Sequence, residues 1–242
     1  MKTRALILAA GKGKRMKSEK TKVLHELNGR PIIEYVVEAL EIDEIERIGV
    51  IVSENNMDEI REHLKDRVDY IVQTEQLGTA HAVLTAENWL SNFEGPVIVV
   101  VGDAPFLQKK TVEDLLNKYI QNNYTCLLLS AVYKEPPAYG RIIRDNNGKL
   151  IRIVEEKDAT VQEKKIKEVS TSHYCFDKDK LFSALKKIKN NNAQGEYYLP
   201  DVIEVFIYEG EKIEAIPVAD HWITFGINNP EDLKIAQKMM TD

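Results

Sequence analysis

Short apolar runs of strand length alternate with amphipathic segments along the first half of the chain. The apolar runs are residues 5–8, 48–52, 70–72, 97–101 and 126–131. Apolar residues recur at helical spacing between them, over residues 31–40, 57–64, 79–89 and 111–121. Pro31 stands at the first position of the first of these helices, where proline is favoured. Alternating strands and helices predict βαβ units, and therefore a mostly parallel sheet with helices on both faces.

The pattern becomes mixed after about residue 134. Strand-like residues 141–144 and 150–154 flank the turn-forming string Asp145-Asn146-Asn147-Gly148, which predicts a β-hairpin. A strand, a helix, a polar loop, a helix, a strand and a closing helix are expected at residues 169–176, 179–188, 190–195, 199–208, 213–218 and 230–240. Neither an internal repeat nor a Pro/Ser-rich linker interrupts the sequence, so we expect one domain over residues 1–242.

The charge and the length of the apolar runs exclude two classes of partner. The formal net charge is −6, whereas nucleic-acid-binding proteins normally carry a basic excess. No apolar run approaches the length of a membrane span, and the apolar start leads into a glycine-rich loop, which favours a first strand over a signal peptide. We therefore expect a cytoplasmic protein with no nucleic-acid or membrane partner. Cys126 and Cys175 are expected to be buried thiols, with a disulfide as the alternative.

The first chemically distinctive segment is the loop Leu8-Ala9-Ala10-Gly11-Lys12-Gly13-Lys14-Arg15-Met16, followed by Lys22. Glycines let backbone N–H groups approach phosphate oxygens, and lysine and arginine neutralise phosphate charge. The loop lacks the Gly-Lys-Ser/Thr of a Walker A motif, and Met16 stands where the dinucleotide fingerprint has its third glycine. The pattern favours a phosphate site over its alternative, a solvated basic turn after a core strand.

This loop resembles the signature loop of the sugar-nucleotide pyrophosphorylases, a nucleotidyltransferase family with a Rossmann-like core, and the resemblance extends over about residues 4–240. It implies an α/β fold with a mostly parallel mixed sheet flanked by helices and a sugar-binding hairpin in the second half. The implied contacts of the nucleotide's base and phosphates are Leu8, Ala9, Ala10 and Gly11. Arg15 and Lys22 would be the catalytic cations on the triphosphate. Cytidylyltransferases and molybdenum-cofactor nucleotidyltransferases share the loop, so it identifies the superfamily alone.

A second motif, Gln73-Thr74-Glu75-Gln76-Leu77-Gly78-Thr79-Ala80-His81-Ala82, joins a predicted strand to a predicted helix. Gly78 and Thr79 stand at the helix start, where free N–H groups can receive an anion or a uracil oxygen, and Gln73 can read a base edge. The alternative is an ordinary helix capped by Thr79. The string closely resembles the uridine-binding segment of the UDP-N-acetylglucosamine pyrophosphorylases, bacterial enzymes that often carry a second, acetyltransferase domain. We interpret His81 as a helix residue without a catalytic role.

A third element, Gly102-Asp103, follows the apolar run 97–101. Ligands of open α/β sheets bind beyond the carboxyl ends of strands, and near a triphosphate a carboxylate there suits Mg²⁺. A turn-capping aspartate is the alternative. The resemblance implies that Gly102 and Asp103 bind the nucleotide, and that Asp103 and Asn228 are the Mg²⁺ ligands. Asn228-Asn229 before Pro230 is also a common turn sequence.

The resemblance also implies a sugar side of the site, formed by Gly140, Glu155 and Asn228 together with the position of Ser170. The string 191–198 would close over the sugar pocket. Two departures from the family pattern stand out. Val101 replaces a tyrosine before Gly-Asp, and Ser170-Thr171-Ser172 replaces Asn-Thr-Gly, whose asparagine contacts the acetamido sugar. The second departure leaves the identity of the sugar open.

The expected reaction is transfer of a uridylyl group from UTP to N-acetylglucosamine-1-phosphate, with Mg²⁺ as cofactor and release of pyrophosphate. The nucleotide-binding half would cover about residues 1–134, the sugar-binding half about 135–229, and a terminal helix 230–242. Glucose-1-phosphate uridylyl or thymidylyl transfer is the nearest alternative, and a non-catalytic nucleotide-sugar sensor is an alternative of another class. The sequence leaves the oligomeric state open.

Overall fold

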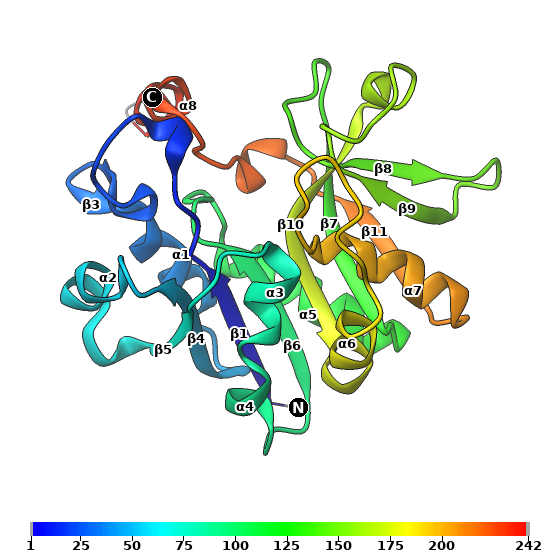
Figure 1. Ribbon diagram of the computed structural model, residues 1–242, viewed down its shortest axis with the longest axis horizontal. Coiled ribbons are helices and arrows are strands. Elements are labelled where there is room, and N and C mark those ends of the chain that lie inside the picture. The colour runs from blue at the N-terminus through cyan, green and yellow to red at the C-terminus, as the bar shows by residue number, and fades with distance from the viewer. Residues whose placement is uncertain (1, 241–242) are drawn as a thin grey trace.

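The computed structural model describes residues 2–240, and within them nine strands form one mixed sheet. Seven strands lie in the order β11-β7-β10-β6-β1-β4-β5, and β8 and β9 extend the sheet from β10 (Figure 1). The strands are β1 (Thr3–Leu8), β4 (Ile45–Ser53), β5 (Asp69–Gln73), β6 (Pro96–Val101), β7 (Cys126–Val132), β8 (Arg141–Arg144), β9 (Leu150–Val154), β10 (Glu168–Asp177) and β11 (Ile213–Pro217). β1 pairs in parallel with β4 and β6, whereas β10 runs antiparallel to β6 and β7. The expected α/β class with a mostly parallel mixed sheet is confirmed.

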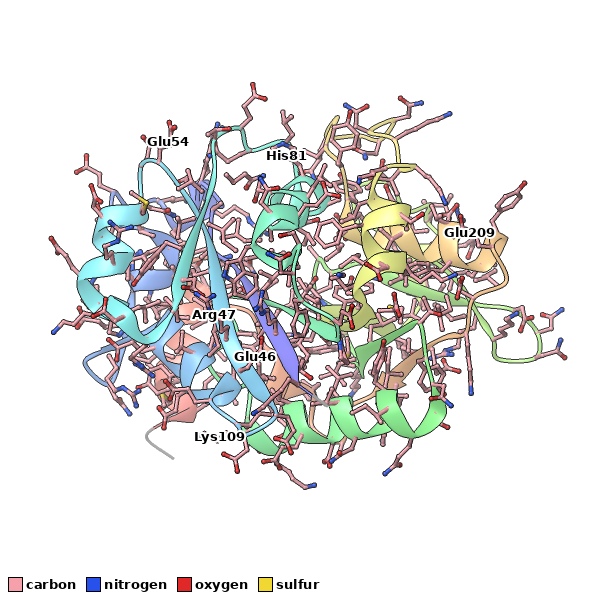
Figure 2. All side chains as sticks on the ribbon, turned by 90° about the horizontal axis from the view of Figure 1, so that it is seen from below. Glu46, Arg47, Glu54, His81, Lys109 and Glu209 are labelled. Atoms are coloured by element: carbon pink, nitrogen blue, oxygen red, sulfur yellow. The ribbon has the colours of Figure 1, made fainter. Side chains whose placement is uncertain are left out.

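Helices cover both faces of the sheet because side chains alternate along each strand. Ala5 and Ile7 of β1 pack with α1 (Ile32–Leu40), α2 (Met57–Leu64) and α5 (Lys109–Asn122). Leu6 points the other way, into the core shared with α3 (Thr79–Leu84), α6 (Lys178–Leu185) and α7 (Val202–Tyr208). In Figure 2, α5 lies on one side of the sheet and α3 and α6 lie on the other.

Several boundaries differ from those expected. The helix expected at residues 79–89 is divided into α3 and α4 (Glu87–Leu90), because Thr85 Oγ1 donates to the carbonyl of Ala82 and turns the chain. Pro31 is the N-cap of α1, not its first residue, and lies in a two-stranded sheet of β2 (Glu26–Leu27) and β3 (Arg30–Pro31). The segment 199–208 begins as a single 3₁₀ turn, Leu199–Asp201.

The second half is tied together by Arg144, the last residue of β8. Its guanidinium binds Glu168 of β10, Glu214 of β11 and the carbonyl of Ala215. Ser130 of β7 donates to the same Glu168 carboxylate at 2.6 Å. This network holds the β8–β9 hairpin against the main sheet. Because its partners lie far apart in the sequence, this network was not predictable from local pattern.

Strand β10 contains a bulge where it passes the end of β6. Its pairing with β7 shifts register between Ser170 and Tyr174, and Ser172 has a φ of 58°. The His173 imidazole is fully buried, and burial lowers its pKa to about 4, so it is neutral. Its Nδ1 donates to the carbonyl of Thr171 at 2.6 Å and closes the bulge. The bulge interrupts the regular alternation of side chains along β10.

The C-terminal helix returns to the N-terminal loop. α8 (Pro230–Met239) lies beside the segment that follows β1, although the two are more than 200 residues apart (Figure 1). Asn229 caps α8 through a capping box with Asp232. The expected helix 230–242 extends past the described residues, and its positions 241–242 lie outside them. Cys126 and Cys175 are buried free thiols. Over residues 2–240, no helix combines the length and apolar character that crossing a membrane requires.

Candidate active site

Two adjoining cavities open at the carboxyl ends of the parallel strands. Leu8, Gln73 and Val101, the last residues of β1, β5 and β6, line a cavity of about 560 Å³ that we term the glycine-loop cavity. A second cavity of about 140 Å³ lies toward the β8–β9 hairpin and is termed the hairpin cavity. The two share Val101 and Asp103. This edge of an open α/β sheet is where ligands of such folds bind.

The sequence-predicted residues divide between these cavities. The glycine-loop cavity is lined by Leu8, Ala9, Ala10, Gly11, Lys22, Gln73, Gly78, Thr79 and Asp103. The hairpin cavity is lined by Arg15, Gly140, Glu155, Ser170, Asn228 and again Asp103. Gly102 lines neither. It is buried, its N–H donates to the carbonyl of Leu8 at 3.0 Å, and a Cβ there would meet β1 at 3.2 Å. Gly102 therefore packs β6 against β1.

Gly13 and Gly11 of the N-terminal loop have different structural roles. Gly13 has a φ of 59°, and a Cβ on it would lie 2.9 Å from Cβ of Lys22. Glycine is therefore required where the loop turns back against Lys22. A Cβ on Gly11 would meet no atom within 4 Å, which leaves that backbone open toward the cavity. The loop continues into a 3₁₀ turn, Lys14–Met16, anchored by the buried Met16.

Two cations and two oxygen-bearing side chains meet between the cavities. The Lys22 ammonium donates to Asp103 Oδ2, and it also donates to Asn228 Oδ1 at 2.8 Å. Arg15 Nη2 donates to the same Asn228 oxygen at 2.8 Å. The side chains of Lys22 and Asp103 are only 17% and 14% exposed, so their charges interact in a poorly solvated setting. The N-terminal loop, the end of β6 and the segment before α8 thus form one charged cluster.

Asn228 is held rigidly although it lies in a loop. The N–H of Ile227 donates to the backbone carbonyl of Asp103 at 2.9 Å. The N–H of Gly226 donates to the Tyr139 hydroxyl at 2.9 Å, and the N–H of Asn228 donates to Asp232 Oδ2 at 2.8 Å. Tyr139 therefore connects the segment before the hairpin to the segment that carries Asn228. Tyr139 was not predicted as a site residue, since a tyrosine beside a glycine carries no signal of this contact.

The oxygens of Asp103 and Asn228 fit a shared divalent cation. Both bind one ammonium nitrogen, so they are close enough to contact a single positive centre. Within residues 2–240, no group of three or more His, Cys, Asp or Glu side chains could hold a metal. Mg²⁺ is commonly bound by one or two protein oxygens, with water and substrate phosphates completing its shell. The donor set is of that kind.

The second motif packs against the segment 197–199. Gly78 has a φ of 116°, and a Cβ on it would lie 2.4 Å from the carbonyl oxygen of Tyr197. The N–H of Ala80 donates to that carbonyl at 2.9 Å, and Thr79 Oγ1 accepts from the N–H of Leu199 at 2.9 Å. Thr79 therefore does not cap its own helix, so the alternative interpretation of this motif as an ordinary capped helix is wrong. It joins the two halves of the molecule beside the glycine-loop cavity.

The hairpin cavity has a carboxylate at its wall. Glu155 follows β9 and lies next to Gly140, where a Cβ would be 3.3 Å from Glu155 Oε1. Burial raises the pKa of Glu155, Asp158 raises it further, and the Arg141 guanidinium opposes the shift. Arg141 is itself buried and donates to the carbonyls of Pro137 and Tyr139. It thereby fixes the backbone that carries Gly140.

Ser170 is 5% exposed, and its hydroxyl already has partners. Its hydroxyl lies 3.3 Å from the Tyr174 hydroxyl and accepts from the N–H of Ser172 at 3.4 Å. Ser172 occupies the left-handed region, which explains why the resemblance implies glycine at this position. The two serines that depart from the family pattern thus both line the hairpin cavity.

The loop of residues 190–196 borders the glycine-loop cavity and does not line the hairpin cavity. Gln194 and Glu196 line the glycine-loop cavity, not the hairpin cavity, together with Lys157. Lys157 donates to Gln194 Oε1, and Asp158 accepts from the N–H of Ala193 at 2.7 Å. The segment after β9 therefore draws this loop toward the glycine-rich loop. Such contacts between distant loops leave no pattern in the sequence.

Comparison with known proteins assigns the chain to a class of enzymes. The family model described as nucleotidyl transferase matches residues 4–237, and the chain belongs to that family of enzymes. The resemblance inferred from the sequence motifs is thereby confirmed.

Individual relatives are similar to the chain over nearly its whole length. The chain is similar to the bifunctional protein GlmU of Halalkalibacterium halodurans, with 45% identity over 98% of this chain and 52% of that protein. It is similar to the bifunctional protein GlmU of Bacillus subtilis at 43% identity, over 98% of this chain and 52% of that protein. The protein of the same name from Thermoanaerobacter pseudethanolicus is 46% identical over 97% of this chain and 51% of its own length. The chain thus spans about half the length of the curated relatives it matches.

Proposed function

We propose that this chain transfers a uridylyl group from UTP to N-acetylglucosamine-1-phosphate, forming UDP-N-acetylglucosamine and pyrophosphate. The observation that carries the proposal is the position of the charged cluster. Asp103 borders both cavities, Lys22 borders the glycine-loop cavity, and Asn228 borders the hairpin cavity. A nucleotide in the first cavity and a sugar phosphate in the second would bring their phosphates together at this cluster.

The chemistry needs positioning more than proton transfer. The second pKa of a phosphate monoester is about 6, so the attacking oxygen of the sugar phosphate is already ionised at neutral pH. Accordingly, no histidine lines either cavity among the described residues. Lys22 and Arg15 would stabilise charge that grows on the leaving pyrophosphate. Mg²⁺ held by Asp103 and Asn228 would neutralise phosphate charge when bound.

One observation supports a second candidate for the sugar substrate. Ser170 lines the hairpin cavity where the family pattern has the asparagine that contacts the acetamido group, and its hydroxyl is occupied by Tyr174 and Ser172. Glucose-1-phosphate, which lacks that group, is therefore the second candidate. A non-catalytic sensor is not favoured, because binding alone has no need of cations for a leaving group.

The test is pyrophosphate release from UTP, CTP and dTTP, each paired with N-acetylglucosamine-1-phosphate and with glucose-1-phosphate. We expect the highest kcat/KM with UTP and the acetamido sugar, and no turnover once the divalent cation is chelated. Asp103→Asn, which keeps the shape and removes the charge, should lower kcat by about a hundredfold or more. Asp114→Asn, on the exposed surface of α5, is the matched control. Near-normal turnover of Asp103→Asn at limiting Mg²⁺ would refute the metal assignment.

A further inference from the structure

The amide of Gln73 is fixed by its neighbours. Gln73 is 3% exposed and lines the glycine-loop cavity from the end of β5. Its Nε2 lies 3.3 Å from the carbonyl oxygen of Gly78 and 3.0 Å from Nδ1 of His81. A carbonyl oxygen can only accept, so the NH₂ group must be the part of the amide that faces Gly78. Each of its two hydrogens then has a partner inside the protein.

This geometry also fixes the tautomer of His81. Since Nε2 of Gln73 donates, Nδ1 of His81 must accept, and the imidazole proton lies on its Nε2. His81 projects from α3 (Figure 2) and does not line the cavity, so it acts on a ligand only through Gln73. The other polar atom of the Gln73 side chain is Oε1. It accepts no hydrogen bond from residues 2–240 and is therefore free to accept one from a ligand.

We propose that His81 is a positioning residue for base selection, which locks the Gln73 amide so that it presents an acceptor alone to the base. This inference rests on the proposed use of UTP. Uracil offers the N3–H as its only donor on the pairing edge, and the locked oxygen would accept it. Cytosine has an unprotonated N3 and a donor only at its N4 amino group. CTP could satisfy the same oxygen only by shifting its ring, which would displace the α-phosphate from the charged cluster.

The histidine is well suited to this task because its ring is rigid. Without it, the amide is held by the 3.3 Å contact to Gly78 alone, and rotation by half a turn would present the NH₂ group to the base. An asparagine at position 81 carries Oδ1 at the place of Nδ1, so it would still accept from Gln73. This substitution separates the hydrogen bond from the presence of an imidazole.

The experiment compares wild type, His81→Ala and His81→Asn by kcat and KM for UTP and CTP, and by calorimetric binding of the two nucleotides. His63→Ala, a half-exposed histidine on α2, is the matched control. In His81→Ala we expect the KM for UTP to rise about tenfold with little change in kcat, and the UTP-to-CTP preference to fall about tenfold, the value of one hydrogen bond. His81→Asn should keep most of the preference. In a Gln73→Ala background, His81→Ala should have no further effect on the UTP-to-CTP preference.

The outcomes separate this inference from the proposed function. If wild type uses UTP and His81→Ala keeps the preference, the inference fails and the proposed function stands. The inference also fails if His81→Asn behaves like His81→Ala, or if the effect of His81→Ala persists without Gln73. If wild type neither binds nor turns over UTP better than CTP, the proposed substrate and the inference are both wrong.

Discussion

Ser172 is strained by its place in the β10 bulge. A residue with a Cβ in the left-handed region costs about 1–2 kcal/mol, and glycine avoids this cost at the expense of a more flexible unfolded chain. We therefore expect Ser172→Gly to raise the free energy of unfolding by about 0.5–1 kcal/mol. Denaturant unfolding monitored by circular dichroism measures the change. Ser172→Ala, which keeps the Cβ, should give no gain. An equal gain from both substitutions would contradict the strain argument.

Lys22 and Arg15 share the oxygen of Asn228 but border different cavities. Both are proposed to act on charge that develops during the reaction, so their loss should affect the transition state more than the ground state. We expect Lys22→Ala to lower kcat by about a hundredfold or more, with Arg15→Ala acting in the same direction. The exposed Lys20→Ala is the control. If the loss were confined to the KM for the sugar phosphate, the proposed role would be wrong.

At the scale of elements, the sequence predicted those features that depend on local pattern. The strands of residues 5–8 and 97–101 were found because a buried strand is a continuous apolar run, and the hairpin at 141–154 because its turn residues are specific. The division of residues 79–89 into α3 and α4 was missed because one threonine hydroxyl competes with the helix backbone. The site residues came from motif resemblance. Tyr139 and Lys157 act through contacts with distant segments, and neither was predictable from neighbouring residues.

The turn that precedes α7 carries a pH-sensitive carboxylate. Burial, followed by the nearby charges of Glu204, Glu155 and Asp158, raises the pKa of Asp201 from 3.8 to about 7. Between these values the folded protein binds more protons than the unfolded chain, so stability falls as the pH rises from about 4 to about 7. Asp201→Asn should remove this loss and be more stable than wild type above pH 7, by about 1 kcal/mol after solvent screening.

Thermal unfolding of wild type and Asp201→Asn from pH 4 to pH 8 checks this prediction. The two curves should converge at the acidic end and separate toward pH 8. Glu62→Gln, on the exposed face of α2, removes a charge outside this group and should leave the pH dependence as in wild type. Parallel curves for wild type and Asp201→Asn would show that this carboxyl does not titrate between pH 4 and 7.

For the whole molecule, the proposed function depends on three distant parts of the chain, the N-terminal loop, the end of β6 and the segment before α8, which meet at the charged cluster. Tyr139, which precedes the hairpin, holds the last of these parts through the N–H of Gly226, two residues before Asn228. Tyr139→Phe leaves this buried N–H without its acceptor, at a cost of about 1–3 kcal/mol, and loosens Asn228. We expect kcat to fall about tenfold while the affinity for UTP changes little. Tyr133→Phe, whose hydroxyl contacts the carbonyl of His221 instead, is the control. Equal losses in both variants would point to general destabilisation.

The hydrogen bonds from Lys22 to Asp103 and Asn228 have a consequence for the order in which metal and nucleotide bind. In the free protein this ammonium serves as an internal counter-ion for the carboxylate. A divalent cation arriving alone would have to expel it without offering it another anion, so metal should bind weakly before nucleotide. A triphosphate brings new negative charge into the glycine-loop cavity, and Lys22 can then exchange one anion for another. The lysine would thus make metal and nucleotide affinities interdependent, and the two should load together as one complex.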